Sequence, residues 1–273
     1  MPKKISIITV CYNNREGLEK TFKSVLGQSY RDFDFLVIDG NSQDGSKEVM
    51  EQYRDKIDFA LSEKDTGVFN AMNKGIKAAT GDFVLFMNSG DIFADEHVLA
   101  NVVDDLTNEF DIYYGNNYKV KSNGSKRLKT YPPALTFSFF YTTCINHQST
   151  FIRRQLFHDY FMYNEQWKIV SDWEFFVYTI CAKNVPYKYL NKTIAEYDFN
   201  GMSSDPKNQA LIRKERLEVI HTHFPAFEKD YQEVARLNAK RTRQLFHIEN
   251  FPIAWKIMKA VLTVFIFVLP KKK

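Results

Sequence analysis

Cysteine is scarce in this sequence of 273 residues, which contains only Cys11, Cys144 and Cys181 and no CxxC pair. An odd number of widely spaced cysteines argues against a disulfide framework or a zinc site and favours a reducing compartment. The net charge is only +4, which is too small to indicate a nucleic-acid partner. The apolar run 260–269 is well short of the ~20 residues that a membrane-spanning helix needs.

The first residues also lack the pattern of a signal peptide. The apolar run Ile5–Val10 is short, is followed at once by Tyr12-Asn13-Asn14-Arg15, and has no small-residue cleavage site after it. We therefore expect a first β-strand here. Internal repeats and low-complexity segments are absent too. The hydrophobic share of 44% is enough for one large domain, or for a domain with an extension.

Strand-like and helix-like segments alternate through the first half of the chain. The predicted strands are 5–10, 33–38, 58–62 and 82–87, and the predicted helices are 16–26, 46–54 and 68–79. Repeated βαβ units of this kind imply an α/β fold, a Rossmann-like, mostly parallel sheet with helices on both faces.

The pattern changes after about residue 110. Segments 111–120 and 126–131 are predicted to be extended, with Asn123-Gly124 as a hairpin signal between them. A strand at 148–152, an amphipathic helix at 172–182 and an extended segment at 186–198 follow. Residues 208–246 are helical in pattern and strongly charged. We place a boundary near residue 115 and expect a C-terminal helical extension.

The tail from 251 to 273 differs in kind, because it holds five Lys and no acidic residue. A basic helix with an apolar face is typical of helices that lie on an anionic membrane surface. The alternative is a helix that docks on the domain and exposes its lysines. We expect the membrane-associating tail.

Two carboxylates follow predicted strands in the same way. Asp91 ends the turn Asn88-Ser89-Gly90-Asp91 after strand 82–87, and Asp39 follows strand 33–38. Open α/β sheets bind ligands at the carboxyl ends of their strands, where a carboxylate can hold a divalent cation and, through it, a diphosphate. The alternative for Asp91 is a cap on the next helix. Asp39 is left to bond a base or ribose, because Asp44 or Ser46 would cap its following helix.

Two further loops offer groups for a nucleotide. The Tyr12 ring can stack on a base, and the side-chain amides of Asn13 and Asn14 can hydrogen-bond the edge of that base. A polar strand-to-helix turn without a ligand would have the same sequence pattern. In the third loop Asp65 is placed to cap the helix that follows. Lys74 lies one to two turns into that helix, where it is either solvated or within reach of a phosphate.

Taken together, these loops resemble the family 2 glycosyltransferases, which have the glycosyltransferase-A fold. The resemblance covers about residues 4–205 and rests on the order and spacing of several motifs: Tyr12-Asn13; Ser24-Val25-Leu26-Gly27-Gln28-Ser29-Tyr30; Asp39 with Ser42-Gln43-Asp44-Gly45-Ser46; Asp65-Thr66-Gly67 with Ala71-Met72-Asn73-Lys74-Gly75; Ala79-Thr80-Gly81-Asp82; and the Asp91 turn. It implies an inverting hexosyltransferase with a nucleotide-sugar donor, which we expect to be a UDP-sugar.

The resemblance also implies roles for the loop residues. Asp39 is expected to meet the nucleotide base, Asp65 to make the second nucleotide contact, and Asp91 to bind Mg²⁺ or Mn²⁺ as the last residue of the family's acidic motif. The chain departs from that motif, because Asn88 and Gly90 fill its earlier acidic positions and leave Asp91 as its one carboxylate. The donor-binding residues expected from the resemblance are Thr9, Tyr12, Asn13, Asp39, Asp65, Lys74, Asn88, Ser89 and His147.

An inverting transfer needs a base to take the proton of the acceptor hydroxyl. Asp172 resembles the family's catalytic base. Alternatively, Asp172 is only the N-cap of helix 173–182, and Glu174 is then the substitute base. His147 either touches the diphosphate or donor sugar or is structural. Gly201-Met202-Ser203 resembles a loop that closes over the donor.

These roles divide the chain into four parts: a nucleotide-sugar-binding half (1–115), an acceptor-binding half (116–207), a charged helical extension (208–250) and the membrane-associating tail (251–273). We expect a glycan or lipid-linked glycan acceptor in surface polysaccharide synthesis, a cytoplasmic protein peripheral at the inner face of the cell membrane, and no nucleic-acid partner. One alternative is a sugar nucleotidyltransferase, which usually needs a Gly-rich loop with Arg after the first strand. The other is a catalytically silent nucleotide-sugar-binding scaffold.

Overall fold

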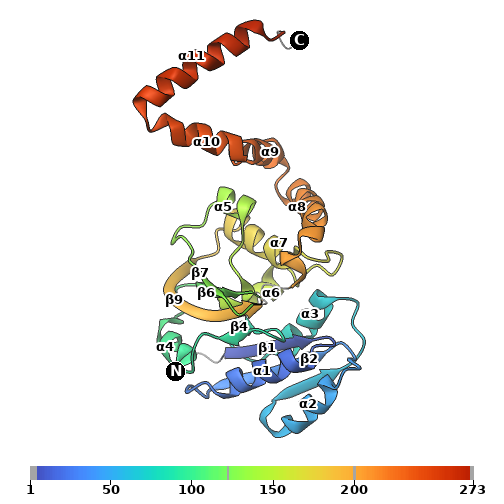
Figure 1. The fold of residues 1–273 in the computed structure, drawn as a ribbon. Helices are drawn as coiled ribbons and strands as arrows, with labels where there is room; N and C mark the ends of the chain where they lie inside the picture. Colours follow the sequence, from blue (N-terminus) through green and yellow to red (C-terminus); the bar gives the residue numbers. More distant parts are fainter. Residues whose placement is uncertain (1–4, 122, 199–200, 271–273) are drawn as a thin grey trace. The chain divides into compact units, whose positions relative to one another are not determined.

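The computed structural model describes residues 5–121, 123–198 and 201–270 (Figure 1). The chain forms two compact units, with the boundary between Phe224 and Pro225. The first unit contains the sheet, and the second is helical.

The parallel half of the sheet follows the predicted βαβ order. Its strands are β1 (Ile5–Cys11), β2 (Phe33–Asp39), β3 (Phe59–Ser62) and β4 (Phe83–Phe86), and the helices between them are α1 (Arg15–Leu26), α2 (Ser46–Gln52) and α3 (Val68–Ala78). β2 and β4 flank β1 in parallel, so that Ile5 pairs with both Phe33 and Phe83. The carboxyl ends of β1, β2, β3 and β4 therefore meet at one edge of the sheet.

The rest of the sheet is mixed rather than parallel. It adds β5 (Ile92–Phe93), β6 (Ile112–Val120), β7 (Lys126–Lys129), β8 (Thr150–Arg153) and β9 (Tyr187–Asp198), in the order β3-β2-β1-β4-β8-β6-β9-β5 with β7 beside β6. β8 is antiparallel to both β4 and β6. The β6–β7 hairpin turns at Gly124, whose positive φ of 77° favours glycine.

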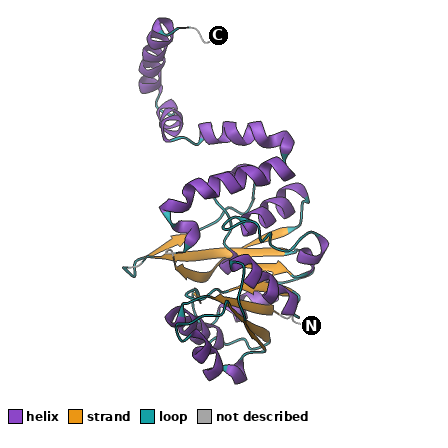
Figure 2. Cartoon of the chain, turned by 90° about the vertical axis from the view of Figure 1, so that its right-hand side faces the viewer, coloured by secondary structure: helices purple, strands orange, loops and turns teal. Residues whose placement is uncertain are grey.

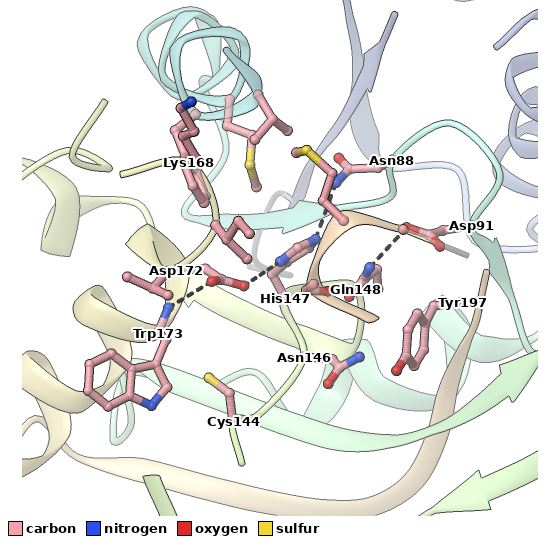
Figure 3. Close-up of a pocket in the computed structure, with 18 of the residues that line it drawn as sticks. Asn88, Asp91, Cys144, Asn146, His147, Gln148, Lys168, Asp172, Trp173 and Tyr197 are labelled. Atoms are coloured by element: carbon pink, nitrogen blue, oxygen red, sulfur yellow. Dashed lines mark hydrogen bonds and ion pairs between the residues drawn. The ribbon is translucent and has the colours of Figure 1, made fainter. Parts of the chain in front are cut away.

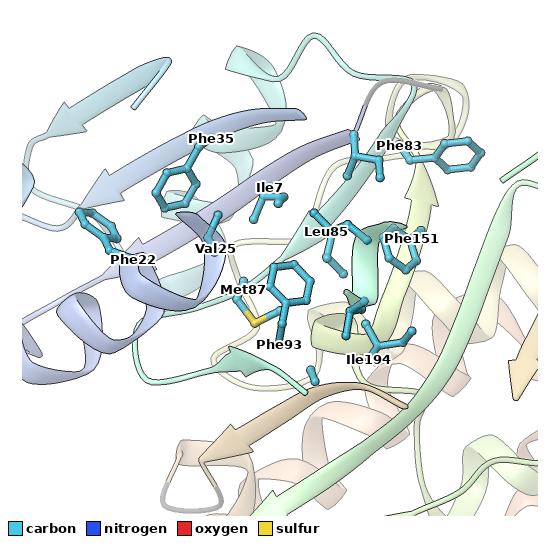
Figure 4. Packing of buried hydrophobic residues seen from close by; sticks show 14 of the residues in the cluster. Ile7, Phe22, Val25, Phe35, Phe83, Leu85, Met87, Phe93, Phe151 and Ile194 are labelled. Atoms are coloured by element: carbon cyan, nitrogen blue, oxygen red, sulfur yellow. The ribbon is translucent and has the colours of Figure 1, made fainter. Parts of the chain in front are cut away.

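Helices cover both faces of the sheet (Figure 2). Side chains of α1 and α2 share a buried cluster with Ile5 and Ile7 of β1, and Figure 4 shows part of this packing. On the opposite face, a Cβ at Gly75 of α3 would lie 2.4 Å from Cγ2 of Ile8. Strand β1 is thus buried on both sides, which is why it reads as a continuous apolar run. These features confirm the predicted α/β fold with helices on both faces of the sheet.

Short elements account for most of the differences from the sequence analysis. The predicted strand 148–152 begins only at Thr150, because His147–Ser149 form a 3₁₀ turn. β5, α4 (Val98–Val102) and α6 (Gln155–Asp159) have two to five residues each, too few to show a period. α5 (Phe137–Thr142) is a short helix rich in aromatic residues, and α7 (Ser171–Val177) continues as a π-turn over Tyr178–Ala182.

The end of the first unit is α8 (Gln209–His223). The second unit consists of α9 (Glu228–Leu237), α10 (Lys240–Glu249) and α11 (Pro252–Val268), after a 3₁₀ turn at Pro225–Phe227. Large apolar side chains of α11 are exposed, among them Ile253, Phe265 and Phe267. Within the described ranges, no helix combines the length and apolarity needed to cross a membrane. The three lysines that end the predicted tail lie outside the described residues.

Candidate active site

A cleft of about 460 Å³ opens at the carboxyl edge of the parallel strands. Its walls come from distant parts of the chain: Asn14, α3, the β4 turn, residues 144–148, residues 168–170 with 172–173, the segment 201–203 and Arg216 of α8. The fold thus brings Asp91 and Asp172, which are 81 positions apart in the sequence, to one cavity.

Asp91 is held at the β4 side of the cleft by a tight turn. Its backbone N–H donates to the carbonyl of Asn88 at 2.8 Å, and Gly90 has a φ of 105°, a conformation that disfavours other residues. The Asp91 side chain is 5% exposed, and its Oδ2 accepts a hydrogen bond from Nε2 of Gln148 at 3.0 Å. Its negative charge also contributes to the raised pKa of Tyr197, about 12, of which burial is the main cause.

A chain of hydrogen bonds runs from this turn to Asp172 (Figure 3). Nδ2 of Asn88 lies 3.2 Å from Nε2 of His147, and Nδ1 of His147 lies 3.0 Å from Oδ2 of Asp172. An amide nitrogen only donates, so Nε2 accepts and the proton of Nδ1 goes to the Asp172 carboxylate. His147 therefore fixes one oxygen of Asp172.

Asp172 is inside the first turn of α7 and is not its N-cap, a position that Val170 occupies. Its Oδ1 accepts from the N–H of Trp173 at 2.8 Å, and the carboxyl is 21% exposed in the cleft. Glu174, the substitute base of the sequence analysis, is outside the cleft lining. Its carboxylate is buried between Nε1 of Trp167 at 2.7 Å and Nε2 of His223 at 2.9 Å.

The carboxylate of Glu215 in α8 supports the segment that leads into Asp172. It accepts backbone N–H bonds from Lys168, Ile169 and Val170 at 2.9, 3.1 and 3.3 Å. These donors precede α7 and have no partner within that helix. A buried side chain far along the sequence thus orients the start of the helix that carries Asp172.

A second group of loop residues meets beside Gly40. A Cβ at Gly40 would lie 3.0 Å from Oδ2 of Asp65 and 3.1 Å from Cδ2 of Tyr12. The Tyr12 ring is 70% exposed, whereas Asp39 is fully buried. Oδ2 of Asp39 accepts from the Ser42 N–H at 3.0 Å and the Ser62 hydroxyl at 2.6 Å; its Oδ1 is buried without a hydrogen-bond partner in the described part of the chain.

Asp65 pairs with Lys74 and does not cap α3, whose N-cap is Gly67. Lys74 also lies 2.8 Å from Glu63. Burial alone would lower the pKa of Lys74, but the bonds to Asp65 and Glu63 outweigh it and raise the pKa. The ammonium group expected to reach a phosphate is therefore already neutralised by two carboxylates.

The cap predicted for α2 is also different in the structure. The N-cap is Gly45, with φ of 96°, rather than Asp44 or Ser46. Asp44 instead accepts hydrogen bonds from the N–H of Ser46 at 3.1 Å and its hydroxyl at 2.6 Å.

Three of the expected donor residues hold loops in place. Thr9 is buried and donates to the Met87 carbonyl at 2.7 Å, which ties β1 to β4. Asn13, at φ of 48°, accepts from the Gln43 N–H at 2.8 Å. Ser89 lines the cleft, and its hydroxyl donates to the Asn14 carbonyl at 3.0 Å. Thr9, Asn13, Tyr12, Asp39, Asp65 and Lys74 do not line the cleft itself.

Gln148, Glu215 and Arg216 have no role in the sequence analysis, and Asn14 appears there only beside Tyr12, as a contact for the edge of a base. Asn14 and Gln148 adjoin motifs that were selected, so the motif spacing could have indicated them. Glu215 and Arg216 are in a charged helix, where nothing local separates them from solvated neighbours such as Lys214.

The oxygen groups near Asp91 suit a hard divalent cation. No cluster of three or more His, Cys, Asp or Glu side chains occurs in the described residues at metal-binding distances. The Asp91 carboxylate is nevertheless in the cleft, and Oδ1 of Asn88 is buried without a partner among the described residues. Mg²⁺ and Mn²⁺ take few protein oxygens when phosphate and water complete the octahedron, so these residues fit the ion.

Comparison with known proteins gives consistent matches. The family model described as Glycosyl transferase family 2 matches residues 6–167, more than half of the chain. An uncharacterized glycosyltransferase of Mycobacterium tuberculosis is 27% identical over 81% of this chain and 85% of its own. A glycosyltransferase of Mycobacterium bovis named for PGL/p-HBAD biosynthesis is 25% identical over 77% and 82%.

Solved structures share the fold at lower identity. S. aureus TarS 1-349 in complex with UDP-GlcNAc has a TM-score of 0.65 at 21% identity, with 87% of this chain and 67% of that chain covered. The mannosyltransferase PcManGT from Pyrobaculum calidifontis, in complex with GDP-Man and Mn²⁺, has a TM-score of 0.59 at 13% identity, with 99% and 77% covered. Asp172, Glu215 and Arg216 lie beyond the range that the family model matches.

Proposed function

The chain belongs to glycosyl transferase family 2, and from this premise we propose an inverting transfer of a sugar from a nucleoside-diphosphate donor to a hydroxyl of a glycan or lipid-linked glycan. The observation that carries the proposal is the His147–Asp172 pair, which shares one cleft with Asp91. In a single displacement with inversion, the acceptor hydroxyl attacks opposite the leaving diphosphate. The reaction therefore needs a base at one side and groups that bind a developing negative charge at the other.

We assign the base to Asp172. Its two oxygens are held by the His147 ring at 3.0 Å and the Trp173 N–H at 2.8 Å, so the carboxylate has one orientation. Each oxygen retains a lone pair, and the carboxyl is partly exposed in the cleft. Asp172 would accept the proton of the acceptor hydroxyl as that oxygen bonds to the anomeric carbon.

The donor is assigned to the sheet edge. Tyr12 would stack on the base, with Asp39 and Asp65 beside it to bond the base and ribose; a UDP-sugar is the donor we favour, as in the TarS complex. The diphosphate would lie along Asn88, Ser89 and Asp91. Asp91 would hold a Mg²⁺ or Mn²⁺ ion, which supplies positive charge to the leaving diphosphate when bound.

The substitution Asp172→Asn tests the base. We expect the rate of transfer to fall about 10²- to 10⁴-fold, because the amide cannot accept the proton, with the Kd for UDP within twofold of wild type. Asp159→Asn is the matched control, since Asp159 is exposed and bonds only Gln155 in the described structure. Normal turnover of the Asp172 variant would refute the assignment.

The same preparation separates an enzyme from a silent scaffold. A transferase is expected to release nucleoside diphosphate slowly from a UDP-sugar without acceptor, and faster with Mn²⁺. A wild-type protein that binds the UDP-sugar but never cleaves it, with or without candidate acceptors, would support the scaffold instead.

We further propose that α11 attaches the enzyme to the inner face of the cell membrane, where a lipid-linked acceptor would be found. Phe267 is 91% exposed, and Lys256 and Lys259 precede the apolar half of the helix. Each large apolar side chain that leaves water contributes roughly 1.5–3 kcal/mol, and each Lys about 1 kcal/mol at an anionic surface.

Vesicle co-sedimentation tests this attachment. Wild-type protein is expected to bind phosphatidylglycerol vesicles and to bind phosphatidylcholine vesicles less. Phe267→Asp should abolish binding, whereas Leu128→Asp, at an exposed apolar residue of the first unit, should not. Failure of the wild type to sediment, or a dimer that Phe267→Asp dissociates in lipid-free solution, would count against the membrane and for self-association.

A further inference from the structure

Arg216 is a cation of the cleft that has no acidic partner among the residues that the structure describes. Its guanidinium lies 4.8 Å above the ring of Trp173, the residue after Asp172, and Nη1 donates to the Tyr141 carbonyl at 3.2 Å. Its Nε is buried without a partner, and the described residues include no carboxylate within ion-pair distance of it. The Trp173 ring that supports it is fixed, because its Nε1 donates to the Phe140 carbonyl at 2.7 Å.

A second such cation is behind the same wall of the cleft. Nζ of Lys129 donates to the Cys144 carbonyl at 3.0 Å and to Oδ1 of Asn146 at 3.2 Å, and it lies 4.6 Å from the Tyr131 ring centroid. Cys144 and Asn146 both line the cleft. In the described part of the chain Lys129, too, has no carboxylate partner.

The two cations are close enough to repel each other. Burial lowers the pKa of Lys129 to about 8, and the positive charges of Lys119 and Arg216 add to the effect. Burial raises the pKa of the Cys144 thiol, on which the charges of Asp172, Arg216 and Lys129 all act. The Cys144 side chain is therefore within electrostatic range of the proposed base and of both cations.

Exposed Lys168 is a further cation of the cleft lining. The cleft lining holds two carboxylates, Asp91 and Asp172. Asp91 is at the β4 turn and bonds Gln148, and Asp172 faces His147. Asp172 forms no ion pair with Arg216, Lys129 or Lys168 among the described residues.

We infer that the wall at Arg216 is an oxyanion subsite for the acceptor: Arg216 binds a phosphate or carboxylate group of an anionic glycan or polyol, while Lys129 behind that wall and Lys168 in the cleft lining add positive charge. The inference rests on the proposed function and names its acceptor class. A guanidinium fork matches both oxyanions, which it can bond through two parallel N–H groups. Because Arg216 lies over Trp173, an anion bound there belongs to the molecule whose hydroxyl is at Asp172. The donor diphosphate is assigned to the other end of the Asn88–His147–Asp172 chain.

Calorimetric titration of the UDP- and Mg²⁺-loaded protein tests the subsite. Loading with UDP occupies the donor position, so that a phosphate probe is not drawn to it. The probes are glycerol 3-phosphate, glucuronate and, as the neutral match, glycerol. We expect saturable binding of one or both anions and none of glycerol; the stronger anion indicates a phosphate or a uronate acceptor.

Arg216→Gln should weaken anion binding at least tenfold and leave the Kd for UDP within twofold. Arg213→Gln, an exposed residue of the same helix, should change neither value. If the Gln variant does not fold, Arg216→Lys is the test. It keeps the positive charge but loses the paired N–H donors of the guanidinium, so it should bind anions several-fold more weakly than wild type.

Three results would overturn the inference: equal binding of glycerol and the anions, anion binding that Arg216 variants do not change, or release of UDP by the anion. A protein that does not bind UDP at all would instead contradict the proposed function. The two failures are therefore separate.

Discussion

Glu215→Gln is the substitution for which the structure gives the most definite expectation. The carboxylate is 5% exposed and accepts three backbone N–H bonds at 2.9, 3.1 and 3.3 Å. Hydrogen bonds to a charged group contribute about 1.5–3 kcal/mol each. A Gln amide keeps one accepting oxygen but turns its NH₂ group toward N–H groups that need an acceptor, so one or two bonds are lost.

The free energy of unfolding should therefore fall by about 2–4 kcal/mol in Glu215→Gln. For a unit of this size the fall corresponds to a decrease in Tm of about 5–15 °C. The affected N–H groups precede α7, so we also expect kcat to fall because Asp172 is less well oriented, while the Kd for UDP changes little. Urea denaturation, a thermal melt and steady-state kinetics measure these effects.

Glu218→Gln is the matched control, because Glu218 is exposed on the same helix and its partner Lys214 is 3.7 Å away. Such surface pairs contribute at most about 1 kcal/mol. A Glu215 variant as stable as the Glu218 variant would show that α8 does not hold the start of α7. A Kd for UDP that changes as much as kcat would show that Glu215 supports the donor site rather than Asp172.

Three further predictions follow from single contacts. His147→Ala should lower kcat by about 10- to 100-fold, because Asp172 loses the bond that orients it, with little change in the Kd for UDP; a changed Kd and an unchanged kcat would place His147 against the donor instead. Lys129→Met should raise the free energy of unfolding at pH 7, because burial lowers the pKa of Lys129 to about 8 and the wild type must hold it charged. Keeping that charge costs about 3 kcal/mol, from which the value of the hydrogen bonds that the variant loses is subtracted. The wild type regains stability as pH rises from 8 toward 10.5, so the advantage of Lys129→Met in urea denaturation should vanish over that range, and a constant advantage would contradict the reasoning. Gly90→Ala should cost about 1–2 kcal/mol of stability because of the positive φ, and a neutral effect in the same assay would mean that the turn relaxes.

The predictable part of the fold was the part with a strong local pattern. Strands β1, β2 and β4 are buried on both faces and flanked by helices with apolar faces, so their period and turns indicated a parallel sheet. The mixed half was harder, because β8 and β5 are short and pair with partners far away in sequence. The caps expected at Asp44 and Asp65 were wrong, since glycines at positive or extended φ begin those helices and the carboxylates found other partners.

The positions of the acidic residues after strands were determined by the sequence alone, because strand ends and loop lengths are local properties that also carry the family resemblance. Their surroundings were decided only by tertiary structure. Asp172 acquires His147, the segment before it acquires Glu215, and Arg216 of the cleft comes near Lys129, through contacts between segments 25 to 87 positions apart. Hydrogen bonds and charges act over a few ångströms of space, whatever the separation along the chain, so no pattern within a window of sequence could reveal which residues would meet.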